Sequence, residues 1–136
     1  MTAKEYLNQA YRLNERINSY LSELDDLRAL ASSIGGSSFE EKYGGTRPTD
    51  APFVRTIEKI DEMERGIAAE IERLISLKTE INTVIGSVYD KDEQTLLRYR
   101  YINCYDWNKI GMLLSVSLRS VHRIHASALK NFHVPA

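Results

Sequence analysis

Two groups of residues in this 136-residue chain have types and spacings that suggest chemistry. Asp90-Lys91-Asp92-Glu93 is acidic, but a calcium loop needs more ligands and a central glycine, so a helix cap at Asp92 is the better interpretation. His122 and His125, taken with Cys104, form an incomplete metal set, because no second cysteine or carboxylate has ligand spacing. Nothing gives Cys104 an oxyanion site or an orienting acid. We therefore expect no catalytic, cofactor-binding or metal-binding residue, and no enzyme.

The remaining chemistry is that of basic and hydroxyl side chains near the C-terminus. After Asp106, two short helical patterns meet at residues 115–117, where only a tight corner fits. Gly111 is small where the helices would cross, Val116 is an apolar plug in the turn, and the Ser117 hydroxyl can cap the second helix. This pattern predicts a helix-turn-helix whose second helix spans 117–131.

The exposed side of that second helix is predicted to enter the major groove of double-stranded DNA. Arg119 and Arg123 would contact guanine edges or phosphates, and Ser117 and Ser120 would contact phosphates at the helix start. The full predicted DNA-binding set is Lys109, Ser117, Leu118, Arg119, Ser120, His122, Arg123 and Lys130.

Residues 93–132 resemble region 4 of the sigma-70 type factors. The resemblance rests on Leu96-Leu97-Arg98-Tyr99, on a short break, and on an ending that runs from Val121 to Ala128-Leu129-Lys130. With Trp107 and Arg123-Ile124-His125, the segment is more similar to small regulators of Gram-positive phages and prophages, including the ArpU-type late transcription regulators. The resemblance implies a transcription regulator that is phage or prophage encoded. Because sigma region 4 also binds RNA polymerase, the resemblance implies RNA polymerase as a second partner.

Charge and composition agree with a DNA-binding end. Residues 92–136 carry six Lys/Arg and three acids, whereas residues 1–91 have a net charge of −4, so the whole-chain charge of −1 hides a basic C-terminal part. Phosphate contacts need such a local positive field. The sequence has no run of about 18 apolar residues, so we expect no membrane span. A lone cysteine cannot form an internal disulfide, and we expect a cytoplasmic protein.

The N-terminal two-thirds is predicted to form two long helices. Apolar residues recur in alternating steps of four and three, which is a heptad seam, at Tyr6, Ala10, Leu13, Ile17, Tyr20, Leu24, Leu27, Ala31 and Ile34. A second seam runs through Ile57, Ile60, Ile67, Ile71, Leu74, Ile81, Ile85 and Val88. In it, Glu64 and Lys78 occupy seam positions, and the neighbouring Met63 and Leu77 can cover for them.

The predicted fold is all-α, a long two-helix coiled-coil hairpin followed by a helix-turn-helix module similar to sigma region 4. We expect a first helix at 1–34, a flexible Gly/Ser/Pro loop at 35–52, a second helix at 53–89 and the module at 90–136. Two narrow apolar stripes favour a homodimer through residues 6–34 and 57–88, and a dimer implies half-sites about 34 Å apart. The alternative is a monomer whose helices pack against the C-terminal module.

The expected function is sequence-specific DNA binding in transcription regulation. Two alternatives stay open at this point. One is a module that binds RNA polymerase or a sigma factor with little DNA affinity, and the other is an oligomeric phage DNA-packaging component.

Overall fold

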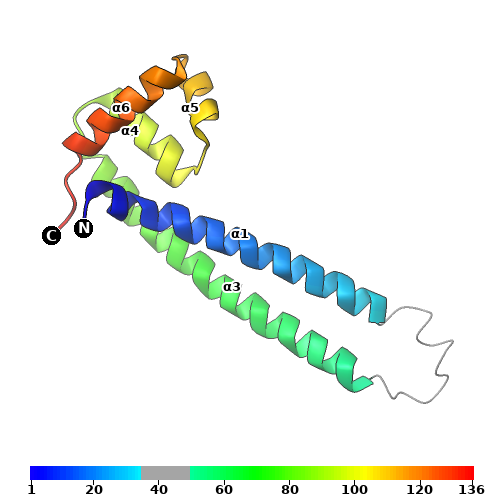
Figure 1. Ribbon diagram of the computed structural model, residues 1–136. Coiled ribbons are helices and arrows are strands. Elements are labelled where there is room, and N and C mark those ends of the chain that lie inside the picture. The colour runs from blue at the N-terminus through cyan, green and yellow to red at the C-terminus, as the bar shows by residue number, and fades with distance from the viewer. Residues whose placement is uncertain (35–49) are drawn as a thin grey trace. The chain divides into compact units, whose positions relative to one another are not determined.

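The computed structural model describes residues 1–34 and 50–136, and all regular secondary structure in this part of the chain is helical (Figure 1). The elements are α1 (Ala3–Ile34), α3 (Asp50–Ile85), α4 (Lys91–Leu97), the π-helical turn η1 (Arg98–Ile102), α5 (Trp107–Leu114) and α6 (Leu118–Asn131). Most of the predicted loop, residues 35–49, lies outside the described residues. Helix α3 begins at Asp50 and has Pro52 in its first turn, where proline is tolerated.

The chain divides into two compact units. Residues 1–15 and 72–136 form the first unit, and residues 16–71 form the second. Each long helix therefore contributes residues to both units.

Helix α1 buries the predicted heptad row. The Thr2 hydroxyl accepts a hydrogen bond from the Glu5 N–H (3.2 Å), which caps the first turn of the helix. Six positions of the row are buried, and Tyr20 and Leu27 are half-buried; the buried ones are Tyr6, Ala10, Leu13, Ile17, Leu24 and Ala31. The side chain of the ninth position, Ile34, lies outside the part that the structure describes. This part of the sequence pattern is confirmed.

Most of the seam predicted for the second long helix is buried. Six of its eight apolar positions are inside, namely Ile60, Ile67, Leu74, Ile81, Ile85 and, just after the end of α3, Val88. Ile57 and Ile71 are instead 44% and 37% exposed, and the half-buried side chains beside the row are Met63, Leu77 and Val84. Met63 and Leu77, which were predicted only to cover for polar neighbours, thus lie on the inner face.

The entry to the C-terminal part is shaped by Asp90 and Gln94. The cap is Asp90 and not Asp92, since the Asp90 carboxylate accepts from the N–H groups of Asp92 (2.8 Å) and Glu93 (3.1 Å). Asp92 lies in the first turn. The buried Gln94 amide donates to the carbonyl oxygens of Gly86 (3.3 Å) and Val88, which satisfies the backbone groups left at the end of α3.

Helix α4 continues into η1, where hydrogen bonds reach one residue further than in an α-helix. The Asn103 N–H donates to the Arg98 carbonyl at 2.9 Å. Cys104 follows with a positive φ of 58°, a conformation that a non-glycine residue rarely adopts. The sequence did not predict this change of helix type.

Helices α5 and α6 meet at a tight corner (Figure 1). The Asp106 carboxylate caps α5 by accepting from the Lys109 N–H (2.8 Å), and Ser115 ends it in the left-handed region with φ 57°. The Val116 N–H closes the turn by donating to the Gly111 carbonyl (3.0 Å). A Cβ atom at Gly111 would lie 3.2 Å from the Val116 carbonyl oxygen and 3.3 Å from Val121 Cγ2, so the close approach depends on glycine.

The core of this C-terminal part gathers side chains from three helices. Leu96 of α4, Ile110 of α5 and Val121 of α6 are fully buried together. Partly buried side chains surround them, namely Tyr99, Tyr105, Trp107, Leu114, Val116 and Ile124. Val116 is therefore the apolar plug that the sequence predicted.

Two further contacts complete the first unit. Glu93 is only 6% exposed, and its carboxylate accepts from Ser127 Oγ (2.5 Å) and Asn131 Nδ2 (3.1 Å), which ties α4 to the second half of α6. The start of α1 packs against the same module, because the rings of Tyr6 and Phe132 lie 5.8 Å apart. Contacts of this kind were expected from the monomer alternative.

Candidate nucleic-acid interface

The basic residues of α6 occupy one face of the helix. Arg119, Arg123 and Lys130 are spaced four and seven residues apart, which places them within about 40° of one another around the helix. All three are exposed. The buried residues Val121 and Ala128 fall on the opposite side. We call Arg119, Arg123 and Lys130 the basic stripe; it points away from the module's core.

The segment that carries the basic stripe contains no acidic residue. Residues 107–136 contain four Lys/Arg and not one Asp or Glu. Within the part of the chain that the structure describes, neither Arg119 nor Arg123 forms a salt bridge. Their guanidinium groups therefore keep their donors for an external anion.

The start of α6 is fixed by the serine cap that the sequence predicted. The Ser117 hydroxyl accepts from the Ser120 N–H (3.2 Å) and donates to Ser120 Oγ (3.1 Å). Both hydroxyls are thus engaged locally, with Ser120 half-buried. Leu118 and Arg119 occupy the first turn and are exposed.

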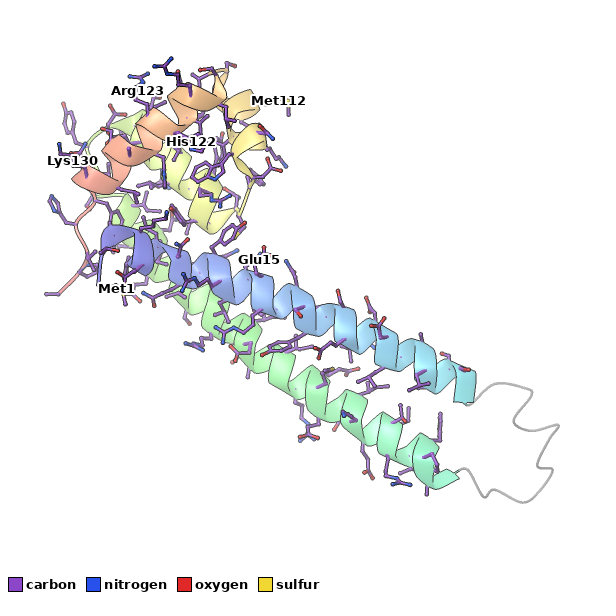
Figure 2. All side chains as sticks on the ribbon, in the orientation of Figure 1. Met1, Glu15, Met112, His122, Arg123 and Lys130 are labelled. Carbon is purple, nitrogen blue, oxygen red and sulfur yellow. The ribbon has the colours of Figure 1, made fainter. Side chains whose placement is uncertain are left out.

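His122 lies beside the basic stripe, on the flank toward α5 (Figure 2). Its ring centroid is 5.2 Å from that of Trp107, so the exposed imidazole of His122 packs against the indole ring. Trp107 is itself covered by Arg100, whose guanidinium carbon lies 4.2 Å from the indole centroid. The Trp107 ring therefore restricts the orientation of His122, which the sequence could not show.

His125 is buried behind this layer and is not available to a ligand. Its Nε2 is 2.7 Å from the Tyr101 hydroxyl, and the side chain is 8% exposed. Burial, and then the nearby cations Lys4, Arg100 and His122, lower the pKa of His125 from 6.5 to about 4. Burial raises the pKa of Tyr101 to about 12. Both side chains are neutral at pH 7 and serve the core.

The remaining predicted DNA-binding residues are more scattered. Lys109 is on α5, with its Nζ 4.0 Å from the Tyr105 ring centroid. Lys130 lies eleven residues after Arg119, about 16 Å further along α6. Arg123 borders a hollow that also contains Asp90, Asp92 and Glu93, so its field is partly opposed, whereas Arg119 does not line that hollow.

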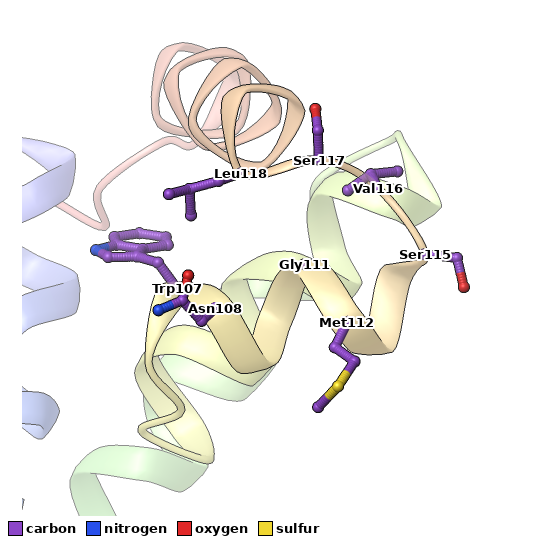
Figure 3. Close-up of a pocket in the computed structure, with 8 residues that line it drawn as sticks. All are labelled: Trp107, Asn108, Gly111, Met112, Ser115, Val116, Ser117 and Leu118. Carbon is purple, nitrogen blue, oxygen red and sulfur yellow. The ribbon is translucent and has the colours of Figure 1, made fainter.

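A hollow of ≈ 380 Å³ opens between α5 and the start of α6 (Figure 3). Its apolar walls are Trp107, Met112, Val116 and Leu118, and its polar walls are Asn108, Ser115 and Ser117. Met112 is 75% exposed and Leu118 is 46% exposed. Of these residues, sequence reasoning included only Ser117 and Leu118 in the site, because the hollow exists only once the two helices are placed.

The described residues contain neither a candidate metal site nor a candidate membrane span. Residues 1–34 and 50–136 contain no group of three or more His, Cys, Asp or Glu side chains arranged to hold a metal ion. Over the same ranges, no helix combines the length and the apolar composition that a membrane span requires.

All regular secondary structure in residues 1–34 and 50–136 is helical, and the basic face of α6 is exposed. Residues 31–133 match the family described as "Protein of unknown function (DUF1492)", and the chain belongs to this family. No curated protein and no solved structure matches the chain.

Proposed function

We propose that this chain is a sequence-specific DNA-binding transcription regulator, phage or prophage encoded, in which α5 and α6 act as a helix-turn-helix and α6 enters the major groove. The observation that carries the proposal is the basic stripe of α6, which lies opposite the buried face in a segment without acids. An α-helix fits the major groove, and arginine pairs with guanine edges and with phosphates. The tight corner at Ser115 supports the proposal, because it presents the start of α6 beyond α5.

Within this proposal the residues of the interface have different roles. Arg119 is the principal base contact, since it lies in the first turn of α6 and does not line the acidic hollow that Arg123 borders. Arg123 adds a weaker contact near Asp90 and Asp92. Lys130 and Lys109 flank these contacts and interact with phosphates. Ser117 and Ser120 hold the first turn of α6 in place, and the Ser117 oxygen is engaged by the backbone.

We also propose that α1 and α3 form an antiparallel coiled-coil hairpin that joins two copies. The heptad row of α1 and the Arg28–Glu64 salt bridge (2.9 Å) between the two helices in the second unit support the hairpin. A dimer would bring two α6 helices to one duplex, so we expect a symmetric operator.

The test is equilibrium binding by fluorescence anisotropy over a salt series. The probes are duplexes from the region upstream of the chain's own coding sequence and scrambled duplexes of equal length. We expect tight binding that weakens steeply with salt and still prefers the native sequence. Weak and equal binding to both probes would contradict the proposal and would direct attention to a protein partner such as RNA polymerase.

A substitution locates the interface. Arg119→Ala should weaken binding to the preferred duplex by about 1–3 kcal/mol and relax its sequence preference, whereas Lys130→Ala should weaken all duplexes alike. Arg55→Ala is the matched control, because it removes an exposed arginine from α3 in the second unit. Equal effects of Arg119→Ala and Arg55→Ala would show that the basic stripe is not the interface.

A further inference from the structure

Leu118 is an apolar side chain that lies outside the buried core. It is the first residue of α6, it is 46% exposed, and the helix is already capped by Ser117. The buried contacts of α6 come instead from Val121, His125 and Ala128. Leu118 therefore adds little to the fold, and its apolar surface remains open to a ligand.

The surroundings of Leu118 are apolar on one side and cationic on the other. It lines the hollow between α5 and α6 together with Trp107 and Met112, and in Figure 3 its side chain extends on the same side as the indole ring. Arg119, the first residue of the basic stripe, follows it directly. An occupant of this place must offer a small apolar group next to a dense negative charge.

Double-stranded DNA meets both requirements at one kind of base pair. The 5-methyl group of thymine is the only apolar group on the major-groove edge of the four bases. The flanking phosphates supply the negative charge that complements Arg119. A protein partner would have to offer an apolar side chain beside an acidic patch, and the test includes that outcome.

We infer that Leu118 reads the 5-methyl group of a thymine in the bound DNA, with the hollow between α5 and α6 receiving that edge of the base pair. The inference rests on the proposed function and adds the base that is recognised. Two adjacent residues then recognise the DNA sequence, Arg119 through hydrogen bonds and Leu118 through an apolar contact. Removal of one methyl group should weaken binding by about 3- to 10-fold, the range expected for one buried methyl or somewhat more.

The experiment removes the methyl group from the DNA and leaves the protein unchanged. Duplexes enriched from a random library by the full chain are resynthesised with each thymine replaced singly by deoxyuridine, which differs from thymidine only by that methyl group. We expect one position in each half-site at which the replacement weakens binding by about 3- to 10-fold. 5-Bromodeoxyuridine at that position should restore binding, because bromine fills the volume of the methyl group.

Two variants assign the effect to Leu118. Leu118→Ala should bind thymine and deoxyuridine duplexes equally well. Leu113→Ala is the matched control, because Leu113 is also 46% exposed but does not line the hollow, and it should retain the discrimination. Both substitutions are at exposed helical positions, and circular dichroism verifies that each variant is folded.

The outcomes separate the inference from the function on which it rests. Sequence-selective binding that is indifferent to every methyl group, or an enriched duplex without thymine, overturns the inference alone. Retention of the discrimination by Leu118→Ala overturns it as well. If no duplex is enriched and binding is weak for all sequences, the proposed function fails together with the inference, and the hollow then serves a protein partner.

Discussion

His125 shows how the module uses an ionisable residue as part of its core. The imidazole is 8% exposed and shares a 2.7 Å hydrogen bond with the Tyr101 hydroxyl, while Lys4, Arg100 and His122 all disfavour a positive charge there. No carboxylate is among the groups that set its pKa. The folded chain therefore favours the neutral imidazole, and protonation of His125 at low pH destabilises the fold.

The stability of the module should fall in mild acid. The pKa of His125 is about 4 in the folded chain and near 6.5 in the unfolded chain, so between these values only the unfolded state takes up the proton. This contribution is complete above about pH 6.5. It declines by up to about 1.4 kcal/mol per pH unit as the pH falls toward 4, and stays constant below that.

Two measurements test the role of His125. A proton NMR titration of the three histidines should show one ring with a midpoint near 4, and that signal should be absent in His125→Phe. Urea unfolding at pH 7 and pH 5 should show a smaller loss of stability for His125→Phe than for the unchanged chain. An imidazole that titrates near 6.5 would mean that His125 is reached by water.

At the scale of the elements, the packing of α5 on α6 depends on the absence of a side chain at Gly111. The Val116 carbonyl is held in the turn by its neighbours and Val121 is fully buried, so neither can move far to admit a Cβ atom at 3.2 or 3.3 Å. A larger residue at this point would separate the two helices and displace the start of α6.

Gly111→Val should therefore destabilise the chain by about 1–3 kcal/mol in urea unfolding and should also weaken DNA binding. Gly66→Val is the matched control. Gly66 is an exposed helical glycine with nothing within 4 Å of the Cβ position, so its replacement should change the stability by only a few tenths of a kcal/mol. Similar effects of both substitutions would mean that helix propensity, and not the crossing of α5 and α6, sets the response.

The elements that the sequence predicted well are those whose signals are local. The heptad row of α1, the Ser117 cap and the apolar Val116 in the turn depend on residues close in sequence, and all three are confirmed. The cap at Asp90 was missed by two residues, because Asp90 and Asp92 carry the same side chain and only the backbone conformation of Asp90 distinguishes them.

The features that the sequence did not predict depend on tertiary contacts. Period alone did not tell whether Ile57 and Ile71 or Met63 and Leu77 would lie inward on α3, since both pairs satisfy a heptad beside the same central row. The contact between Trp107 and His122, like the hollow beside Leu118, joins residues of different helices. Among the site residues, the Ser117 cap and the spacing of Arg119, Arg123 and Lys130 were readable from the sequence.

At the scale of the whole molecule, the exposed apolar residues of the second unit bear on the number of chains. Ile57 and Ile71 of α3 are 44% and 37% exposed, and they lie within about 40° of each other around the helix. Apolar side chains that recur along a long helix are typical of a surface that a further helix covers.

We predict that the chain is a dimer in solution and that charge on this surface of α3 separates the two copies. Sedimentation equilibrium at micromolar concentration should give twice the 15.6 kDa chain mass for the unchanged protein. Ile57→Lys with Ile71→Lys should give the mass of one chain with its helix content retained, because both side chains are already partly in water. Ala69→Lys is the control for added charge, since Ala69 is exposed on another side of α3, and it should remain dimeric. A single-chain mass for the unchanged protein would favour the monomer in which α1 packs on the C-terminal module. A single α6 would then contact each duplex, and the preferred DNA site would lose its expected symmetry.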